Sequence, residues 1–181
     1  MRMTAHGRYA LGALAAVALA VLAAPTAWAQ VGNSATASSN ADATVITALT
    51  LNNTAGLDFG DFTPGTNGGT IVVATDGTPS TTGDVSVVDD SPQAAAFDVT
   101  GESAKVYDIL LPGSAILGGP GVDMTADTFV AETASDGIGL TGTVTGGADT
   151  ITVGATLTVA GVATQTSGNY SGTFNVTITY Q

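Results

Sequence analysis

Short segments rich in β-forming residues recur along this chain, and a glycine, proline or Asx turn signal follows each of them. Turn sequences such as TPGTNGG, DDSPQ and PGSAILGGPG separate the segments, and no convincing helical period occurs between them. This regular spacing is typical of an antiparallel sandwich or barrel, so the sequence predicts an all-β fold. We expect strands at residues 43–51, 69–75, 84–88, 95–100, 105–111, 128–131, 138–145, 149–159 and 169–180.

The first 29 residues have the pattern of a secretory signal peptide. Arg2 and Arg8 precede an apolar run from Ala10 to Ala24, and Ala27-Trp28-Ala29 forms a small-residue cleavage site. A membrane anchor is the competing interpretation, but the apolar run is too short to span a bilayer. We expect cleavage between Ala29 and Gln30. The mature protein would then be exported to the periplasm, cell surface or medium without membrane insertion.

Removal of this segment leaves few kinds of reactive side chain in the mature protein. The chain has three Lys plus Arg and fifteen Asp plus Glu, so loss of Arg2 and Arg8 leaves Lys105 and a net charge of −14. His6 is also lost, and there is no cysteine. This acidity excludes nucleic acid and anionic membrane as partners. Ser-His-Asp, Cys-His and histidine-metal sites are excluded as well. We therefore expect no enzyme and no cofactor.

Carboxylates are the remaining reactive groups. Asp89 and Asp90 are the most conspicuous carboxylate pair for a glycosidase, but VVDDSPQ favours a solvated turn. Other carboxylates in turns offer oxygen ligands for Ca²⁺, but none lies in an EF-hand loop or a glycine-rich repeat. Solubilising surface charge is the favoured interpretation of these residues, and we expect no metal site: Asp76, Asp123, Asp127 and Asp149.

Residues 30–42 form an N-terminal extension that precedes a single predicted β-sandwich domain at 43–181. Small apolar residues occupy alternate positions along it and into the domain: Ala35, Ala37, Ala41, Ala43 and Val45. A flexible linker explains this composition. The alternative is a strand that becomes ordered when it pairs with an open sheet edge.

The C-terminal segment SGNYSGTFNVTITYQ, residues 167–181, alternates between apolar and polar residues. In an extended chain one side would carry Tyr170, Gly172, Phe174, Val176, Ile178 and Tyr180. Tyr180 is the penultimate residue, and Gly168 is the fourteenth from the end. This pair resembles the C-terminal signature of chaperone-usher pilus subunits.

A second resemblance lies in the N-terminal half of the domain. LDFGDFTPG, residues 57–65, is similar to the start of the spore-coat-U type of archaic pilins. Across Leu57–Gln181, the order of GGTIVV, AAFDVTG, VYDILLPG, MTADTF and VGATLTVA most resembles a secreted bacterial family, domain of unknown function 4402.

The resemblance implies an immunoglobulin-like, pilin-like β-sandwich that lacks its last strand. A strand from a periplasmic chaperone, and later from the next subunit, would fill the groove beside the C-terminal strand. The extension would supply the donor strand. Gly168, Tyr170, Phe174, Val176, Ile178 and Tyr180 would form the interaction edge.

The chain departs from the pilin pattern in two ways. The extension has alanines where pilins usually have larger apolar residues, and the cysteine pair found in many pilins is absent. The leading hypothesis is a non-enzymatic, exported, pilin-like structural subunit that assembles with copies of itself, aided by a chaperone and an usher. The alternatives are a self-contained monomeric sandwich that binds carbohydrate or another envelope component, and a carboxylate hydrolase.

Overall fold

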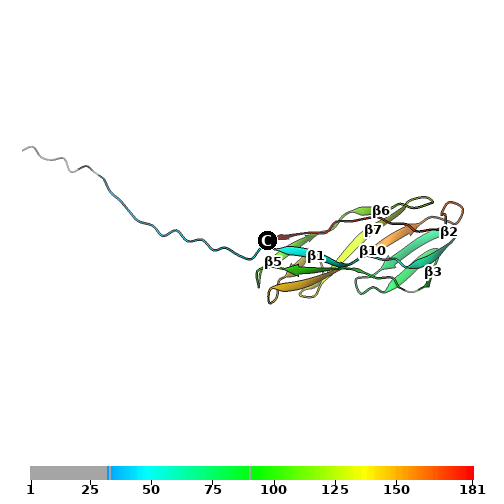
Figure 1. Cartoon of the computed structure of the whole chain (residues 1–181), viewed down its shortest axis with the longest axis horizontal. Coiled ribbons are helices and arrows are strands. Elements are labelled where there is room, and N and C mark those ends of the chain that lie inside the picture. The colour runs from blue at the N-terminus through cyan, green and yellow to red at the C-terminus, as the bar shows by residue number, and fades with distance from the viewer. Residues whose placement is uncertain (1–31, 33, 90) are drawn as a thin grey trace, which may run out of the picture. The chain divides into compact units, whose positions relative to one another are not determined.

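The computed structural model describes residue 32, residues 34–89 and residues 91–181 (Figure 1). Within these residues it contains strands and no helix, so the prediction of an all-β antiparallel sandwich is confirmed. The predicted signal peptide, its cleavage site and Asp90 lie outside the described residues. The strands are β1 (Thr50–Ala55), β2 (Asp61–Val73), β3 (Pro79–Asp89), β4 (Ala95–Thr100), β5 (Val106–Leu110), β6 (Ser114–Leu117), β7 (Met124–Thr133), β8 (Gly137–Ile138), β9 (Thr141–Thr143), β10 (Ala148–Val159) and β11 (Thr177–Tyr180).

Two antiparallel sheets make up the compact unit Ala43–Gln181. The larger sheet has the order β1-β4-β10-β2-β3, and β7 joins it through β10 and also pairs with β6 and β8. The smaller sheet has the order β11-β5-β9. β10 organises the larger sheet, since its first half pairs with β4, its second half pairs with β2, and β7 pairs along most of its length.

The core follows from the two-residue period of the strands. On β10 the apolar residues at alternate positions, Ile151, Val153, Ala155, Leu157 and Val159, are all buried. They divide between two hydrophobic clusters. One cluster lies between β2, β3, β7 and the second half of β10, and the other lies between β4, β5 and the first half of β10.

Two predicted N-terminal boundaries are wrong. The first strand begins at Thr50, opposite Thr100, and residues 43–49 form no strand. Val45 is 97% exposed, and residues 43–49 pair with no described strand, because an alternating pattern does not by itself provide a partner strand. The glycine-rich run 63–69 lies within β2 as a bulge opposite β3, and the chain turns instead at 74–78.

The predictions for two segments in the second half of the chain are also wrong. Residues 114–117 form β6 rather than part of a turn, because they pair with β7. The regular strand expected over 169–180 is confined to β11, with one further β-bridge at Ser171. The other residues of the predicted strand, 169–170 and 172–176, form no ladder with any strand in the described part of the chain.

Candidate functional site: an apolar groove beside the C-terminal segment

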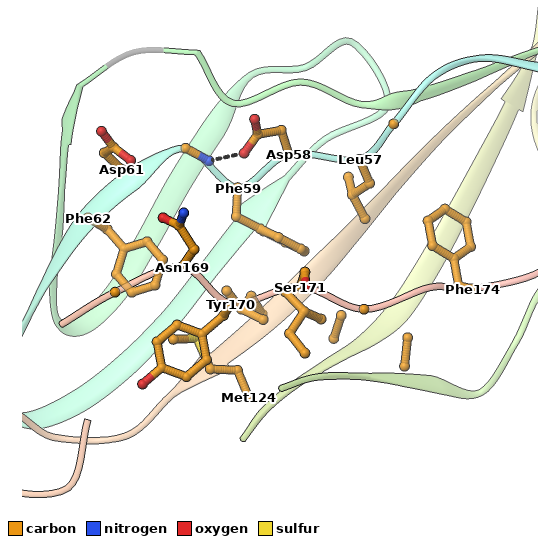
Figure 2. A pocket seen from close by; sticks show the side chains of 18 of the residues that line it. Leu57, Asp58, Phe59, Asp61, Phe62, Met124, Asn169, Tyr170, Ser171 and Phe174 are labelled. Carbon is orange, nitrogen blue, oxygen red and sulfur yellow. Dashed lines mark hydrogen bonds between the residues drawn. The ribbon is translucent and has the colours of Figure 1, made fainter. Parts of the chain in front are cut away.

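A groove of about 1130 Å³ opens between two segments that lie outside regular strands for most of their length (Figure 2). Residues 56–64 form one wall and residues 165–174 form the other. Side chains of β4, β6, β7 and β10 form the floor, which is part of the hydrophobic core. The groove therefore opens between two stretches of backbone onto core residues that are themselves mostly buried, such as Phe97, Met124 and Leu157.

The first wall has one backbone edge bonded and one edge turned to the groove. Asp58 exchanges two backbone hydrogen bonds with Gln93, each 2.8 Å long. Neighbouring residues of an extended chain direct their backbone groups to opposite sides, so those of Leu57 and Phe59 point away from Gln93. Among the described residues, Leu57 and Phe59 have no backbone hydrogen-bond partner.

The second wall has the same arrangement. Ser171 exchanges two backbone hydrogen bonds of 3.0 Å with Gly118, just beyond β6. The backbone groups of Tyr170 and Gly172 consequently point away from β6. Gly172 fits closely, since a Cβ atom there would lie 2.1 Å from the Ile116 carbonyl oxygen. Farther along, β11 pairs with β5 and, in the described part of the chain, with no second strand.

Aromatic rings dominate the apolar lining. All five phenylalanines of the chain line this groove: Phe59, Phe62, Phe97, Phe129 and Phe174. Phe174 of the second wall lies 5.0 Å from Phe129 of β7 and 6.4 Å from Phe97 of β4, measured between ring centroids. These contacts tie the second wall to the larger sheet. The first wall adds two carboxylates, Asp58 and Asp61, and no Lys or Arg of the described residues lines the groove.

The predicted interaction edge lies largely along the second wall. Tyr170, Phe174, Val176, Ile178 and Tyr180 are half-buried and alternate with exposed residues, so they face the core. Gly168 is exposed at the end of the groove, with a φ of 148°. Only Gly168, Tyr170 and Phe174 of the predicted edge line the groove itself.

Tyr180 connects the C-terminal strand to the start of the domain. Its hydroxyl accepts a 2.6 Å hydrogen bond from the Glu102 N–H and donates a 3.0 Å bond to the Thr47 carbonyl. The Thr47 N–H in turn donates to Glu102 Oε2 at 2.9 Å, and this bond lowers the pKa of Glu102. The backbone of Thr47 is therefore fixed on both sides where the extension leaves the domain.

The predicted donor residues lie in the segment that precedes β1. Residues 34–48 form neither helix nor strand, and the five predicted donor positions are all exposed: Ala35, Ala37, Ala41, Ala43 and Val45. The first wall and the phenylalanines of the floor were not predicted as site residues. LDFGDF holds two of the five phenylalanines, but no local pattern in the sequence shows that the five lie together.

Two of the carboxylates considered above as calcium ligands form local hydrogen bonds: Asp76 lies in a turn, whereas Asp127 lies within β7. Asp76 accepts a bond from the Thr78 N–H, which lowers the pKa of Asp76, and Asp127 accepts one from the Thr128 hydroxyl. No group of three or more His, Cys, Asp or Glu in the described ranges is placed to hold a metal ion. Nor do those ranges contain a helix that is long and apolar enough to cross a membrane.

Asp149 belongs to a polar cluster that joins the two sheets. The buried Tyr107 of β5 donates a 2.7 Å hydrogen bond to Asp149 Oδ2 on β10, and Ser135 donates to the same oxygen at 2.6 Å. The Thr150 N–H donates to Asp149 Oδ1 at 2.8 Å. Burial raises the pKa of Tyr107, and the bond to Asp149 and its charge raise it further.

This cluster predicts a pH dependence of stability. The unfolded chain loses the Tyr107 proton near pH 10, whereas the folded protein keeps it. The stabilisation of the folded state by protonated Tyr107 is therefore complete below about pH 10 and is lost as the pH rises above it. Tyr107→Phe should remove this alkaline loss and should cost about 1–3 kcal/mol at neutral pH, because Asp149 loses a donor. Urea unfolding from pH 7 to 11 measures both effects. Tyr170→Phe is the control, and equal alkaline slopes in the wild type and Tyr107→Phe would contradict the assignment.

Comparison with known proteins identifies the family. Residues 49–180 match the family described as Domain of unknown function (DUF4402). The chain belongs to this family. The match covers both walls and the floor of the groove, and it begins after the predicted donor positions 35–45. No curated protein and no solved structure matches the chain.

Proposed function

We propose that this DUF4402 protein is a non-enzymatic, exported structural subunit with a pilin-like fold. In this proposal a strand from another molecule enters the groove between residues 56–64 and 165–174. The observation that carries the proposal is a pair of backbone edges, at Leu57 and Phe59 and at Tyr170 and Gly172, that have no partner among the described residues and flank a floor of apolar core residues.

A β-strand suits this groove better than a compact ligand does. Its N–H and C=O groups alternate between two sides, so one strand can bond to both walls at once. Its side chains alternate as well, so every second residue meets the apolar floor while the others face water. Covering exposed apolar surface and unpaired backbone is favourable and removes an aggregation hazard.

The extension of a second copy is the proposed donor in the assembled state. It carries small apolar residues at alternate positions, and its described residues 34–42 are exposed and have no regular structure. Donation from each copy to the next does not close on itself, so it produces a head-to-tail fibre. Before assembly, a periplasmic chaperone would cover the same groove, and an usher would mediate export to the cell surface.

The test is to size two forms of the protein. A chain of residues 30–181 is expected to form concentration-dependent assemblies, and a chain of residues 44–181 is expected to remain monomeric because it lacks most of the donor strand. Sedimentation velocity of both forms over a hundredfold range of concentration measures this. Two stable, soluble monomers would rule out strand exchange and leave the groove to the alternative, a ligand of the cell envelope.

A further inference from the structure

We infer that Tyr180, Glu102 and Thr47 form a clamp that carries mechanical load between the N-terminal extension and the second wall of the groove. The inference goes beyond the proposed function but rests on it, because load arises where copies are joined head to tail. Each copy in such a fibre is pulled at its own extension and at its groove, where the strand of another copy is held. The connections between these two places therefore determine how well a copy resists the pull.

The chain itself connects the extension to the first wall. Residues 43–49, the root of the extension, lead into β1, and β1 leads into the first wall, residues 56–64. The second wall, residues 165–174, comes much later in the sequence and has no such covalent connection to the root. A load on the root reaches the second wall directly only through noncovalent contacts.

Tyr180 provides these contacts at the end of β11. Its hydroxyl donates a 3.0 Å hydrogen bond to the Thr47 carbonyl and accepts a 2.6 Å bond from the Glu102 N–H. Glu102 Oε2 in turn accepts a 2.9 Å bond from the Thr47 N–H. Both backbone groups of Thr47 are thus bonded, one to Tyr180 and the other to Glu102, which is itself bonded to Tyr180. A pull on Thr47 acts on these bonds together.

Close packing fixes the Tyr180 hydroxyl in this position. A Cβ atom on Gly101 would lie 2.3 Å from the hydroxyl oxygen and 3.0 Å from Leu49 Cδ1, so the tyrosine and the leucine both lie directly over the glycine. Leu49 and Tyr180 are half-buried and pack against the same hydrophobic cluster. The clamp is therefore a packed junction between the root, the C-terminal strand and the turn after β4.

β11 is itself anchored where the clamp loads it. Tyr180 pairs with Tyr107 in the ladder to β5, so the C-terminus lies beside β5 (Figure 1). The Gln181 N–H donates a 3.1 Å bond to the Val106 carbonyl, and its side-chain Nε2 donates to Asp108 Oδ1 at 2.7 Å. These bonds extend the β5 pairing past the tyrosine. A load on Tyr180 is therefore passed into β11, which continues the second wall along the chain.

The experiment pulls on single copies of the mature chain of residues 30–181 in an optical trap. Cysteines replace Ser38 in the extension and Thr173 on the second wall, both of which are exposed, and the chain has no cysteine of its own. The rate of the first rupture is measured at one constant force, because forced unfolding reports the rate of unfolding. A second pair of cysteines, at Ser80 on β3 and at Thr173, pulls on the domain without loading the root.

Two variants break the clamp by different means. Tyr180→Phe removes the hydroxyl, and Gly101→Ala displaces it with a Cβ atom. Tyr170→Phe is the matched control, because its hydroxyl donates to the Thr166 carbonyl within the second wall itself.

Both clamp variants should rupture about tenfold faster than the wild type when pulled from Ser38, and Tyr170→Phe should stay within about threefold of it. When pulled from Ser80, both clamp variants should also stay within about threefold of the wild type. Equal rates from Ser38 in all four proteins, or the same acceleration from Ser80, would overturn the inference. Because single copies are measured, a chain that fails to assemble would overturn the proposed function while the rupture rates still test the clamp.

Discussion

Phe174→Ala is expected to lower the free energy of unfolding by about 3 kcal/mol. The ring packs edge-to-face against Phe97 and at a tilt against Phe129, and it joins the second wall of the groove to β4 and β7. Its loss removes apolar burial and leaves a cavity, and the expected cost is at the low end of the range for Phe→Ala because the ring is half-buried. Urea unfolding measures the change in the free energy of unfolding. All variants are compared at one low protein concentration, because assembly would otherwise alter the apparent stability.

Two further variants make this result specific. Phe174→Leu keeps much of the apolar area and should cost about 1 kcal/mol, which is the share of the ring contacts. Thr173→Ala changes the exposed neighbouring residue and should stay within about 0.5 kcal/mol of the wild type. If Phe174→Ala matched Thr173→Ala, the ring would not anchor this wall.

The fold class could be predicted because residue alternation and turn chemistry act locally. β10 was predicted to within one residue, since its buried row of Ile151, Val153, Ala155, Leu157 and Val159 is unbroken. Prediction failed where pairing decides the structure. Residues 43–49 alternate like a strand but pair with no strand in the described part of the chain, whereas residues 114–117 lie in a glycine- and proline-rich stretch but pair with β7.

The candidate site could be predicted only on one side. The alternating C-terminal segment indicated which residues face the core, and Tyr170 and Phe174 do so beside the groove. The opposite wall depends on the bridge between Asp58 and Gln93, which lie far apart in the sequence. Clustering of the phenylalanines depends on the approach of β4, β7 and both walls, and no local pattern encodes that approach.

The second prediction concerns contact between copies. The chain has no cysteine, so a disulfide between two introduced cysteines identifies their contact without background. One copy carries Thr173→Cys, which is exposed on the second wall next to Phe174. The other copy carries a single cysteine in the extension. In the proposed donor strand Thr36, Ser38 and Asn40 face water, whereas the control positions Ala37 and Ala41 face the apolar floor of the groove.

Adjacent strands bring Cα atoms to within about 5.5 Å, which is the separation that a disulfide requires. Thr173 alternates with Phe174, so its side chain lies on the water-facing side of the second wall. A donor strand in the groove should therefore present residues of its water-facing row, such as Ser38, to a cysteine at position 173. Residues of the row that faces the apolar floor, such as Ala37, should not reach it.

The most direct test is to refold the two copies together, oxidise them, and measure which positions form the mixed disulfide dimer. The proposal predicts a strong link from one or two of the positions 36, 38 and 40, and none from 37 or 41. Equal links from all five positions, no link from any, or a link that forms only when both cysteines are in one copy would contradict strand donation between molecules.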